Sequence, residues 1–242
     1  MPVAAVQGNA VKPRRYRLGR IVVAWLRSLT HVLLELHVEG IERVPATGPV
    51  LLIANHVNFM DPVLAYTIHR RYIRGMTKDG TFRQFFFGFL AWSVDAIPVA
   101  RGTPDLKAIR ACVKTLEAGW ALYIAPEGTR SGDGRLQQAH AGVVVVLSRV
   151  GRQIPVFPVA YIGLEHFWPT FRKLRRTPVR IVVGEPFYVS WPEGGVHQAE
   201  RERILSEMMG AIAVLLPPEN RGWYADQVGR ASRYLVRAPA SG

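Results

Sequence analysis

The stretch Val50-Leu-Leu-Ile-Ala54 decides the fold class, because it is a short, continuous apolar run that follows the turn residues Gly48 and Pro49. Such a run is typical of a strand that is buried on both faces of a parallel sheet. A second run, Ala121-Leu-Tyr-Ile-Ala125, has the same character. Strand-like and helix-like segments alternate around both runs, which predicts an α/β fold with a mixed, largely parallel sheet flanked by helices.

Helix and turn signals predict the remaining elements. Asp61-Pro62 indicates a helix start, with Asp61 as the N-cap and Pro62 at the first helical position, and this helix should reach about Arg71. A C-terminal helix at 199–215 is ended by Pro217-Pro218. The other expected helices are 81–92, 103–118 and 141–150, and the other expected strands are 73–77, 96–100, 154–162 and 179–183.

Composition restricts the class of protein. Of the 242 residues, 49% are hydrophobic and 20% are charged, which is typical of a folded chain. We expect a flexible basic arm at 1–15 and a single domain at 16–242. The formal net charge of +13 predicts an anionic partner, either nucleic acid, an acidic membrane or a phosphorylated substrate. The single cysteine, Cys112, excludes a disulfide framework and is expected to pack within a helix.

The segment 16–37 has apolar residues at helical spacing, with Trp25 among them and Arg20 and Arg27 on another face. Such a helix could lie in the interface of an anionic membrane or pack on the domain's own core, and the pattern favours neither. No window has the length and apolarity of an export signal or a membrane span, so we expect neither in this sequence.

Polar clusters directly follow the two apolar runs. The first is Asn55-His-Val-Asn-Phe-Met-Asp61 and the second is Pro126-Glu-Gly-Thr-Arg-Ser131. Because the carboxyl ends of parallel strands meet at one edge of a sheet, the two clusters should face each other across a cleft.

The side chains in these clusters predict acid–base chemistry beside an anion site. A carboxylate at Asp61 could fix the tautomer of His56 and leave its other nitrogen free as a general base. The sequence has no Gly-x-Ser-x-Gly elbow, which favours a substrate hydroxyl as the nucleophile. Gly128 allows close approach of a ligand, Arg130 suits a phosphate, and Glu127 could hold that arginine or bind a substrate hydroxyl.

Four blocks occur in the order and at the spacing of one enzyme family. Asn-His-x4-Asp is present as Asn55, His56 and Asp61, and Glu-Gly-Thr-Arg-Ser is complete at 127–131. The second block corresponds to Asp95-Ala-Ile-Pro-Val-Ala-Arg101 and the fourth to Ile154-Pro155-Val156. Over about residues 44–162, the sequence therefore resembles the glycerolipid acyltransferase family, of the PlsC type that acylates lysophosphatidic acid.

The resemblance implies an O-acyltransferase whose catalytic residues are His56 and Asp61. It would move a fatty acyl group from acyl-CoA or acyl-carrier protein to a lysophospholipid, with 1-acyl-glycerol-3-phosphate as acceptor and phosphatidic acid as product. No metal or other cofactor is implied, and we expect a peripheral enzyme at the cytoplasmic face of an anionic membrane, with no nucleic-acid partner. The implied substrate-binding residues are Lys78, Arg101, Glu127, Gly128, Thr129 and Arg130.

Several features leave alternatives open. Asp95 stands where the family has glycine, and His140 stands where it often has a basic residue, so the acceptor could be a different lysolipid. The apolar segment 85–92 could line an acyl groove, enter the membrane or be a buried core helix, and the basic run 172–176 is expected to be a surface loop. A basic nucleic-acid-binding module and a thioesterase are the alternatives of other classes.

Overall fold

The two apolar runs are the central strands of the sheet. β2 (Val50–Ala54) and β5 (Ala121–Ile124) lie parallel, with Val50 opposite Ala121 and Ile53 opposite Ile124. Both strands are fully buried, as expected for a strand with helices on both sides. The computed structural model describes residues 15–69, 71–100, 105–193 and 195–237.

The sheet extends from this centre in both directions. Within the described residues it has nine strands in the order β1-β7-β6-β2-β5-β3-β4, with β8 paired to β6 and β9 paired to β8. Five pairs are parallel and three, β6–β7, β6–β8 and β8–β9, are antiparallel, which confirms the predicted mixed, largely parallel sheet. The other strands are β1 (Leu34–Glu39), β3 (Ile73–Lys78), β4 (Ile97–Val99), β6 (Val156–Ile162), β7 (Thr177–Val183), β8 (Phe187–Val189) and β9 (Leu235–Arg237).

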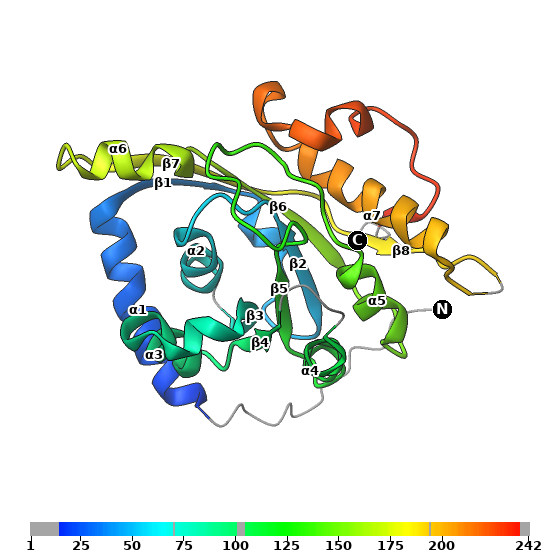
Figure 1. Cartoon of the computed structure of the whole chain (residues 1–242), viewed down its shortest axis with the longest axis horizontal. Helices are drawn as coiled ribbons and strands as arrows, with labels where there is room; N and C mark the ends of the chain where they lie inside the picture. Colours follow the sequence, from blue (N-terminus) through cyan, green and yellow to red (C-terminus); the bar gives the residue numbers. More distant parts are fainter. Residues whose placement is uncertain (1–14, 70, 101–104, 194, 238–242) are drawn as a thin grey trace.

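Helices cover both faces of the sheet (Figure 1). α4 (Leu106–Glu117), α5 (Gly142–Arg149) and α7 (Gln198–Ala213) lie on one side, which we call the α7 face. α1 (Tyr16–Leu33), α2 (Met60–Ile68) and α3 (Phe85–Ser93) lie on the other, the α2 face, and α6 (Phe167–Phe171) lies beside β7. Short 3-10 helices span Ile41–Arg43 (η1), Asp79–Arg83 (η2), Leu164–His166 (η3), Pro218–Asn220 (η4) and Gly222–Gln227 (η5).

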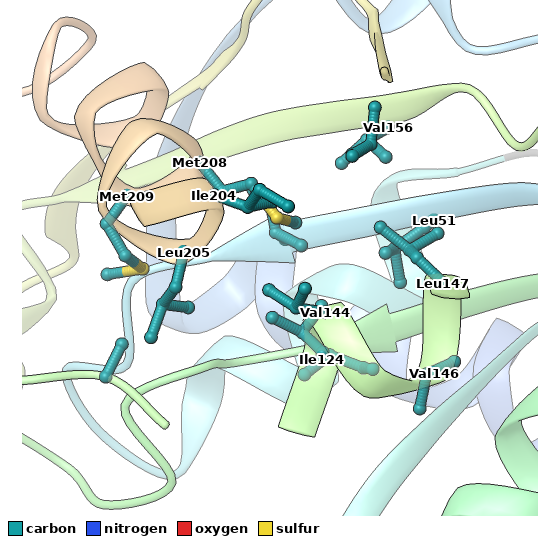
Figure 2. Packing of buried hydrophobic residues seen from close by; sticks show 14 of the residues in the cluster. Leu51, Ile124, Val144, Val146, Leu147, Val156, Ile204, Leu205, Met208 and Met209 are labelled. Atoms are coloured by element: carbon teal, nitrogen blue, oxygen red, sulfur yellow. The ribbon is translucent and has the colours of Figure 1, made fainter. Parts of the chain in front are cut away.

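Alternation along the strands sends their side chains to different cores. Leu51 and Ile53 of β2 pack with α4, α5 and α7, whereas Val50, Leu52 and Ala54 pack with α2. On the α7 face the packing is aliphatic and methionine-rich, as Figure 2 shows for Val144, Leu147, Ile204, Leu205, Met208 and Met209.

The N-terminal helix is shorter than predicted. α1 ends at Leu33, and residues 34–39 form β1, which pairs with β7 through Leu34 opposite Thr177. The helical prediction for 34–37 was wrong because Leu34-Glu-Leu-His-Val-Glu39 alternates apolar and polar residues, as a half-buried strand does. Of the predicted arm at 1–15, only Arg15 lies within the described residues.

α1 packs on the domain with one side and leaves the other side exposed. Val22 and Leu26 are buried, and Arg27 ties the helix to α2 by donating to the carbonyls of Thr67 and His69, at 2.7 and 3.2 Å. Trp25, which the pattern placed in the same stripe as Val22, is 54% exposed. Core packing therefore explains only the inner side of this helix.

Other boundaries differ for local reasons. The predicted helix at 81–92 is divided between η2 and α3. α4 begins after Asp105, whose side chain accepts from the backbone N–H groups of Lys107 and Ala108, while the predicted start at 103–104 lies outside the described residues. β8, β9 and α6 were not predicted. In the part of the chain that the structure describes, no helix has the length and apolarity to cross a membrane.

Candidate active site

A histidine–aspartate pair lies at the carboxyl end of β2. His56 Nδ1 is 2.7 Å from Asp61 Oδ2, and the same oxygen accepts from the backbone N–H groups of Val57 and Asn58, at 2.6 and 3.0 Å. The Asp61 side chain is 0% exposed and that of His56 is 17% exposed. With Nδ1 hydrogen-bonded to the carboxylate, the proton-accepting nitrogen of the neutral ring is Nε2.

Asp61 reaches the imidazole because it is not the N-cap of α2. The helix begins at Met60 with Phe59 at the cap position, so Asp61 lies in the first turn and its carboxylate points back to residues 56–58. The predicted N-cap role of Asp61, with Pro62 at the first position, was therefore wrong by two residues. The helix also ends at Ile68 rather than near Arg71.

Two asparagines shape the loop that carries His56. The buried Asn55 side chain exchanges two 2.8 Å hydrogen bonds with the backbone N–H and C=O of Tyr161, which extends the pairing of β2 with β6 beyond the strand. Asn58 Oδ1 accepts from Met60 N at 2.7 Å, and its Nδ2 donates to Leu164 O at 2.6 Å. The loop is thus fixed on both sides of the histidine.

Glu127 connects the two polar clusters. Its Oε1 accepts from His56 N and its Oε2 accepts from Gln137 N, both at 2.7 Å. Burial raises the pKa of this carboxyl to about 7, although the two backbone N–H groups act in the opposite direction. The structure does not show the alternative in which Glu127 holds Arg130: among the described residues the two form no ion pair, and the hydrogen bonds of Glu127 come from backbone N–H groups. Glu127 holds two loops together instead.

Backbone hydrogen bonds complete the contact between the clusters. Ser131 N donates to His56 O at 2.8 Å, and Gly132 N donates to Val57 O at 3.2 Å. Gly128 has φ +66°, and a Cβ at this position would lie 3.2 Å from the ring of His140. Residues 128–130 are exposed to solvent, and the backbone hydrogen bonds of the next two residues hold this loop beside His56.

Two of the expected basic residues, Lys78 and Arg130, lie at or after strand ends at the same edge of the sheet. Arg130 and Lys78 are exposed, and neither forms an ion pair with the described residues. Lys78 ends β3, which is separated from β2 by β5 alone, so the two strand ends are about 10 Å apart at the usual strand spacing. Arg101 lies outside the described residues, so its position is not assigned.

The backbone conformation at Asp95 explains why the family has glycine at this position and why aspartate can replace it. Its φ is +50°, in the left-handed region that favours glycine but that aspartate tolerates better than most residues. Its Oδ2 accepts from Tyr72 Oη at 3.3 Å, and its Oδ1 accepts from Arg15 Nη1 at 3.4 Å. The Asp95 side chain therefore connects the segment before β4 to Arg15, at the start of α1.

An aromatic cluster that was not predicted adjoins the loop between His56 and Asp61. Phe59, between His56 and Asp61, has ring-centroid distances of 6.0 Å to Phe87 of α3 and of 5.4 and 5.5 Å to Phe167 and Trp168 of α6. Its sequence neighbours carry no signal for these partners, because α6 comes more than a hundred residues later. Two surface helices, α3 and α6, thus contact the loop that carries His56.

Other candidate chemistry is limited among the residues described. Cys112 is fully buried in α4, and burial raises its pKa to about 12, in agreement with the predicted packing role. Within the described ranges, no three His, Cys, Asp or Glu side chains are grouped so that they could hold a metal ion.

Comparisons with known proteins agree with this geometry. A chloroplastic 1-acyl-sn-glycerol-3-phosphate acyltransferase of Brassica napus is 27% identical over 63% of this chain and 45% of its own length. One of Arabidopsis thaliana is 25% identical over 78% and 53%, so the chain spans about half the length of these two plant relatives. The enzyme of that name from Bacillus subtilis is 26% identical over 67% of this chain and 77% of its own.

A solved structure supports the fold. PlsC of Thermotoga maritima, a 1-acyl-sn-glycerophosphate acyltransferase, aligns with a TM-score of 0.62 and 21% identity over 90% of this chain and 85% of that one. The sequence model of the acyltransferase family matches residues 35–162, which is more than half of the chain and includes both polar clusters. The chain therefore belongs to the acyltransferase family, as its four sequence blocks predicted.

Proposed function

We propose that this protein transfers a fatty acyl group from an acyl thioester to the free hydroxyl of a lysophospholipid. The observation that carries the proposal is the buried His56–Asp61 pair, joined by Glu127 to an exposed loop with an unpaired arginine. The names of the relatives support 1-acyl-glycerol-3-phosphate as acceptor and phosphatidic acid as product. We propose acyl-CoA or acyl-carrier protein as donor, with no metal or other cofactor.

His56 acts as the base in this reaction. Its Nε2 takes the proton of the acceptor hydroxyl while the oxygen attacks the thioester carbonyl carbon, so that a C–O bond forms. The C–S bond then breaks, and the imidazolium returns the proton to the departing thiolate. The carboxylate of Asp61 holds the ring in the required tautomer and stabilises the imidazolium between these two steps.

The acceptor's phosphate binds where two unpaired cations lie near the base. Arg130 is in the loop hydrogen-bonded to the backbone of residues 56–57, and Lys78 extends from the end of β3. A guanidinium offers paired N–H donors to phosphate oxygens, and a lysine adds a second positive charge. Gly128 and Thr129 provide the exposed backbone between them, and Arg101 is a further proposed contact from the family pattern.

We also propose that the enzyme works at an anionic membrane, as a peripheral protein at the cytoplasmic face. Three elements of the α2 side expose apolar residues: Ile21, Trp25 and Val32 of α1, Phe85, Phe86, Phe89 and Trp92 of α3, and Trp168 and Phe171 of α6. Leu174, just after α6, is 94% exposed. The neighbouring Arg172, Lys173 and Arg175 are exposed and form no ion pair with any described residue.

This arrangement fits an acidic lipid surface. Apolar side chains surrounded by cations bind an anionic interface through burial and through attraction of about 1 kcal/mol for each basic residue. Arg176 differs from its neighbours, because it donates to Leu34 O and fixes the turn to the start of β1. The contact of Phe59 with α3 and α6 brings the catalytic loop to the same surface.

Thiol release from acyl-CoA or acyl-carrier protein tests the reaction. Purified protein should release thiol only when a lysophospholipid is present, and mass spectrometry should identify the product from a panel of acceptors. His56→Ala should lose at least about 1,000-fold in rate, whereas His37→Ala, an exposed histidine on β1, should not change it. Thiol release without acceptor would indicate a thioesterase, and near-normal rates in His56→Ala would contradict the mechanism.

Sedimentation with vesicles tests the membrane surface. Binding should be stronger to vesicles with phosphatidylglycerol than to pure phosphatidylcholine, and salt should weaken it. Trp168→Ser should reduce binding, whereas Trp223→Ser should not, although this tryptophan of η5 is 64% exposed against 50% for Trp168. Equal loss in both variants, or binding to nucleic acid in place of anionic vesicles, would contradict this surface.

A further inference from the structure

One oxygen of the buried carboxylate beside His56 has no donor. Asp61 Oδ2 accepts three hydrogen bonds, from His56 Nδ1, Val57 N and Asn58 N. Asp61 Oδ1 is equally buried and has no hydrogen-bond partner among the described residues. A buried, unpaired carboxylate oxygen is costly, so such an atom calls for a specific explanation.

Two tyrosine hydroxyls in the same region also lack a regular hydrogen-bond partner. Tyr123 Oη and Tyr161 Oη are buried, and neither has a hydrogen-bond partner of regular geometry among the described residues, although the two hydroxyls are close enough to act on each other. Tyr123 is on β5 and Tyr161 on β6, the two neighbours of β2. Both side chains belong to the core of the α2 face, together with Met60 and Leu64 on either side of Asp61.

Electrostatics places these hydroxyls near the carboxylate. Burial raises the pKa of Tyr123 and of Tyr161 well above the ordinary value. Tyr161 and then the negative charge of Asp61 raise that of Tyr123 further, and Asp61 also raises that of Tyr161, where the Tyr123 hydroxyl acts in the opposite direction. Burial also raises the pKa of Asp61, and the hydrogen bond from His56 offsets this only in part. The carboxylate therefore lacks a stabilising donor at Oδ1.

We infer that an internal water binds among Asp61 Oδ1, Tyr123 Oη and Tyr161 Oη, and that the two tyrosines thereby position and stabilise the ionised aspartate. The water donates a proton to Oδ1 and accepts from the two hydroxyls, which gives the three hydrogen bonds usual for a buried water. This one molecule satisfies all three buried atoms. Tyr123 and Tyr161 are positioning residues, because they act on His56 only through Asp61.

The inference deepens the proposed function and rests on it for the role of His56. In the resting state, with His56 neutral, the full charge of Asp61 needs donors, and the water supplies one at Oδ1. When His56 is protonated, the imidazolium itself neutralises that charge and the water matters less. Removing the hydroxyls should therefore destabilise the neutral histidine more than the imidazolium, and the pKa of the pair should rise.

Other titratable groups lie on the elements packed around His56 and Asp61. Glu127, which follows β5, accepts a hydrogen bond from His56 N, and the charge of Asp133 in the following loop raises the pKa of Glu127. Tyr66 of α2 acts on Tyr123, but its own hydroxyl accepts from Gly75 N at 3.0 Å. Tyr66→Phe therefore offers a matched control, because it removes a tyrosine hydroxyl of the same face that has no contact with Asp61.

NMR titration of the His56 ring tests the inference without reference to activity. In Tyr123→Phe, Tyr161→Phe and the double variant, the pKa of His56 should rise, by about 0.5–1 pH unit in the double variant. The acid limb of the pH–kcat profile should move by the same amount, so that kcat on that limb is about three- to tenfold lower, with KM within about twofold of the wild type. Tyr66→Phe should move neither, although it leaves Gly75 N unpaired.

The sign of the shift separates the outcomes. A lower pKa would mean that Asp61 donates a proton toward the tyrosines, and an unchanged pKa in all three variants would mean that the hydroxyls do not act on it. Either result would overturn the inference, as would a crystal structure without water at this position. If the NMR shift occurs but no acceptor is acylated, the proposed function fails and the positioning network stands.

Discussion

The two faces of the sheet differ in what they bury. On the α7 face, β2 contributes Leu51 and Ile53 to a core of aliphatic and methionine side chains (Figure 2). On the α2 face, the same region of the sheet buries Asn55, Asp61 and the hydroxyls of two tyrosines. The helices of the α2 face also expose most of the large apolar residues, among them Phe85, which is 99% exposed.

This difference indicates a division of roles within one sheet. An apolar core provides stability through burial of about 25 cal/mol for each Å² of apolar surface, with no constraint on chemistry. A face with a buried carboxylate and exposed aromatic residues is less favourable for stability, and such features are retained where they serve function. Changes on the α7 face should therefore alter stability, and changes on the α2 face should alter activity or membrane binding.

The largest expected effect concerns Asp61, the carboxylate of the proposed catalytic pair. Asp61→Asn should lower kcat by about 1,000-fold, because a neutral amide neither stabilises the imidazolium nor fixes the tautomer of His56. The free energy of unfolding should change little, because the variant also removes a buried charge. Thiol release at saturating substrate and urea denaturation measure the two quantities. A variant that unfolds readily would contradict the separation of roles.

The next effect concerns the α7 face. Met208 of α7 is fully buried, and Met208→Ala should lower the free energy of unfolding by about 2–5 kcal/mol through lost contacts and a residual cavity. Met208→Leu conserves volume and should lose less than about 1.5 kcal/mol. Below the unfolding transition, kcat should remain within about twofold of the wild type in both variants. A loss of kcat in folded Met208→Ala would show that this face supports the chemistry directly.

The third prediction concerns the pH dependence of stability through Glu127. Its folded-state pKa is about 7, against an ordinary value of 4.5, so the folded protein binds this proton more tightly than the unfolded chain. The stabilisation is complete below pH 4.5 and is lost as the pH rises to about 7, by at most about 3 kcal/mol. Urea denaturation from pH 5 to pH 8 should show this slope in the wild type, and Glu127→Gln should flatten it.

The smallest effect is expected at the membrane surface. Leu174→Ser should weaken binding to phosphatidylglycerol vesicles about tenfold, which corresponds to about 1.4 kcal/mol. Stability should not change, because this side chain is 94% exposed. Val236→Ser, on the exposed β9 strand, is the control and should bind as the wild type does. If the two variants bind equally, Leu174 does not enter the bilayer.

Local patterns predicted the centre of the fold. The bounds of Val50–Ala54 match the prediction, and those of the neighbouring strands β5 and β6 lie within about two residues of it, because a short apolar run bounded by turn residues favours a strand that is buried on both faces. Short edge strands such as Phe187–Val189 and Leu235–Arg237 carry too few residues for a periodic signal. Residues 34–37 were assigned to a helix because leucines at 29, 33 and 36 also fit helical spacing.

The sequence predicted the part of the candidate site whose residues are close together in the chain. His56 and Asp61 are five residues apart, and the strand-end position of both loops follows from the parallel sheet. The role of Glu127 depends on the backbone of a segment 71 residues away, and the tyrosine hydroxyls depend on side-chain packing under α2. No pattern in sequence encodes such contacts, and the same is true of Phe59 with α6.

The most direct test of the division of roles is a paired measurement of kcat and unfolding free energy on Asp61→Asn and Met208→Ala. We predict opposite outcomes, with Asp61→Asn folded and nearly inactive in thiol release, and Met208→Ala destabilised but with near-normal kcat while folded. Both quantities falling together in either variant, or activity surviving in Asp61→Asn, would contradict the proposal that the α2 face carries the chemistry of this enzyme.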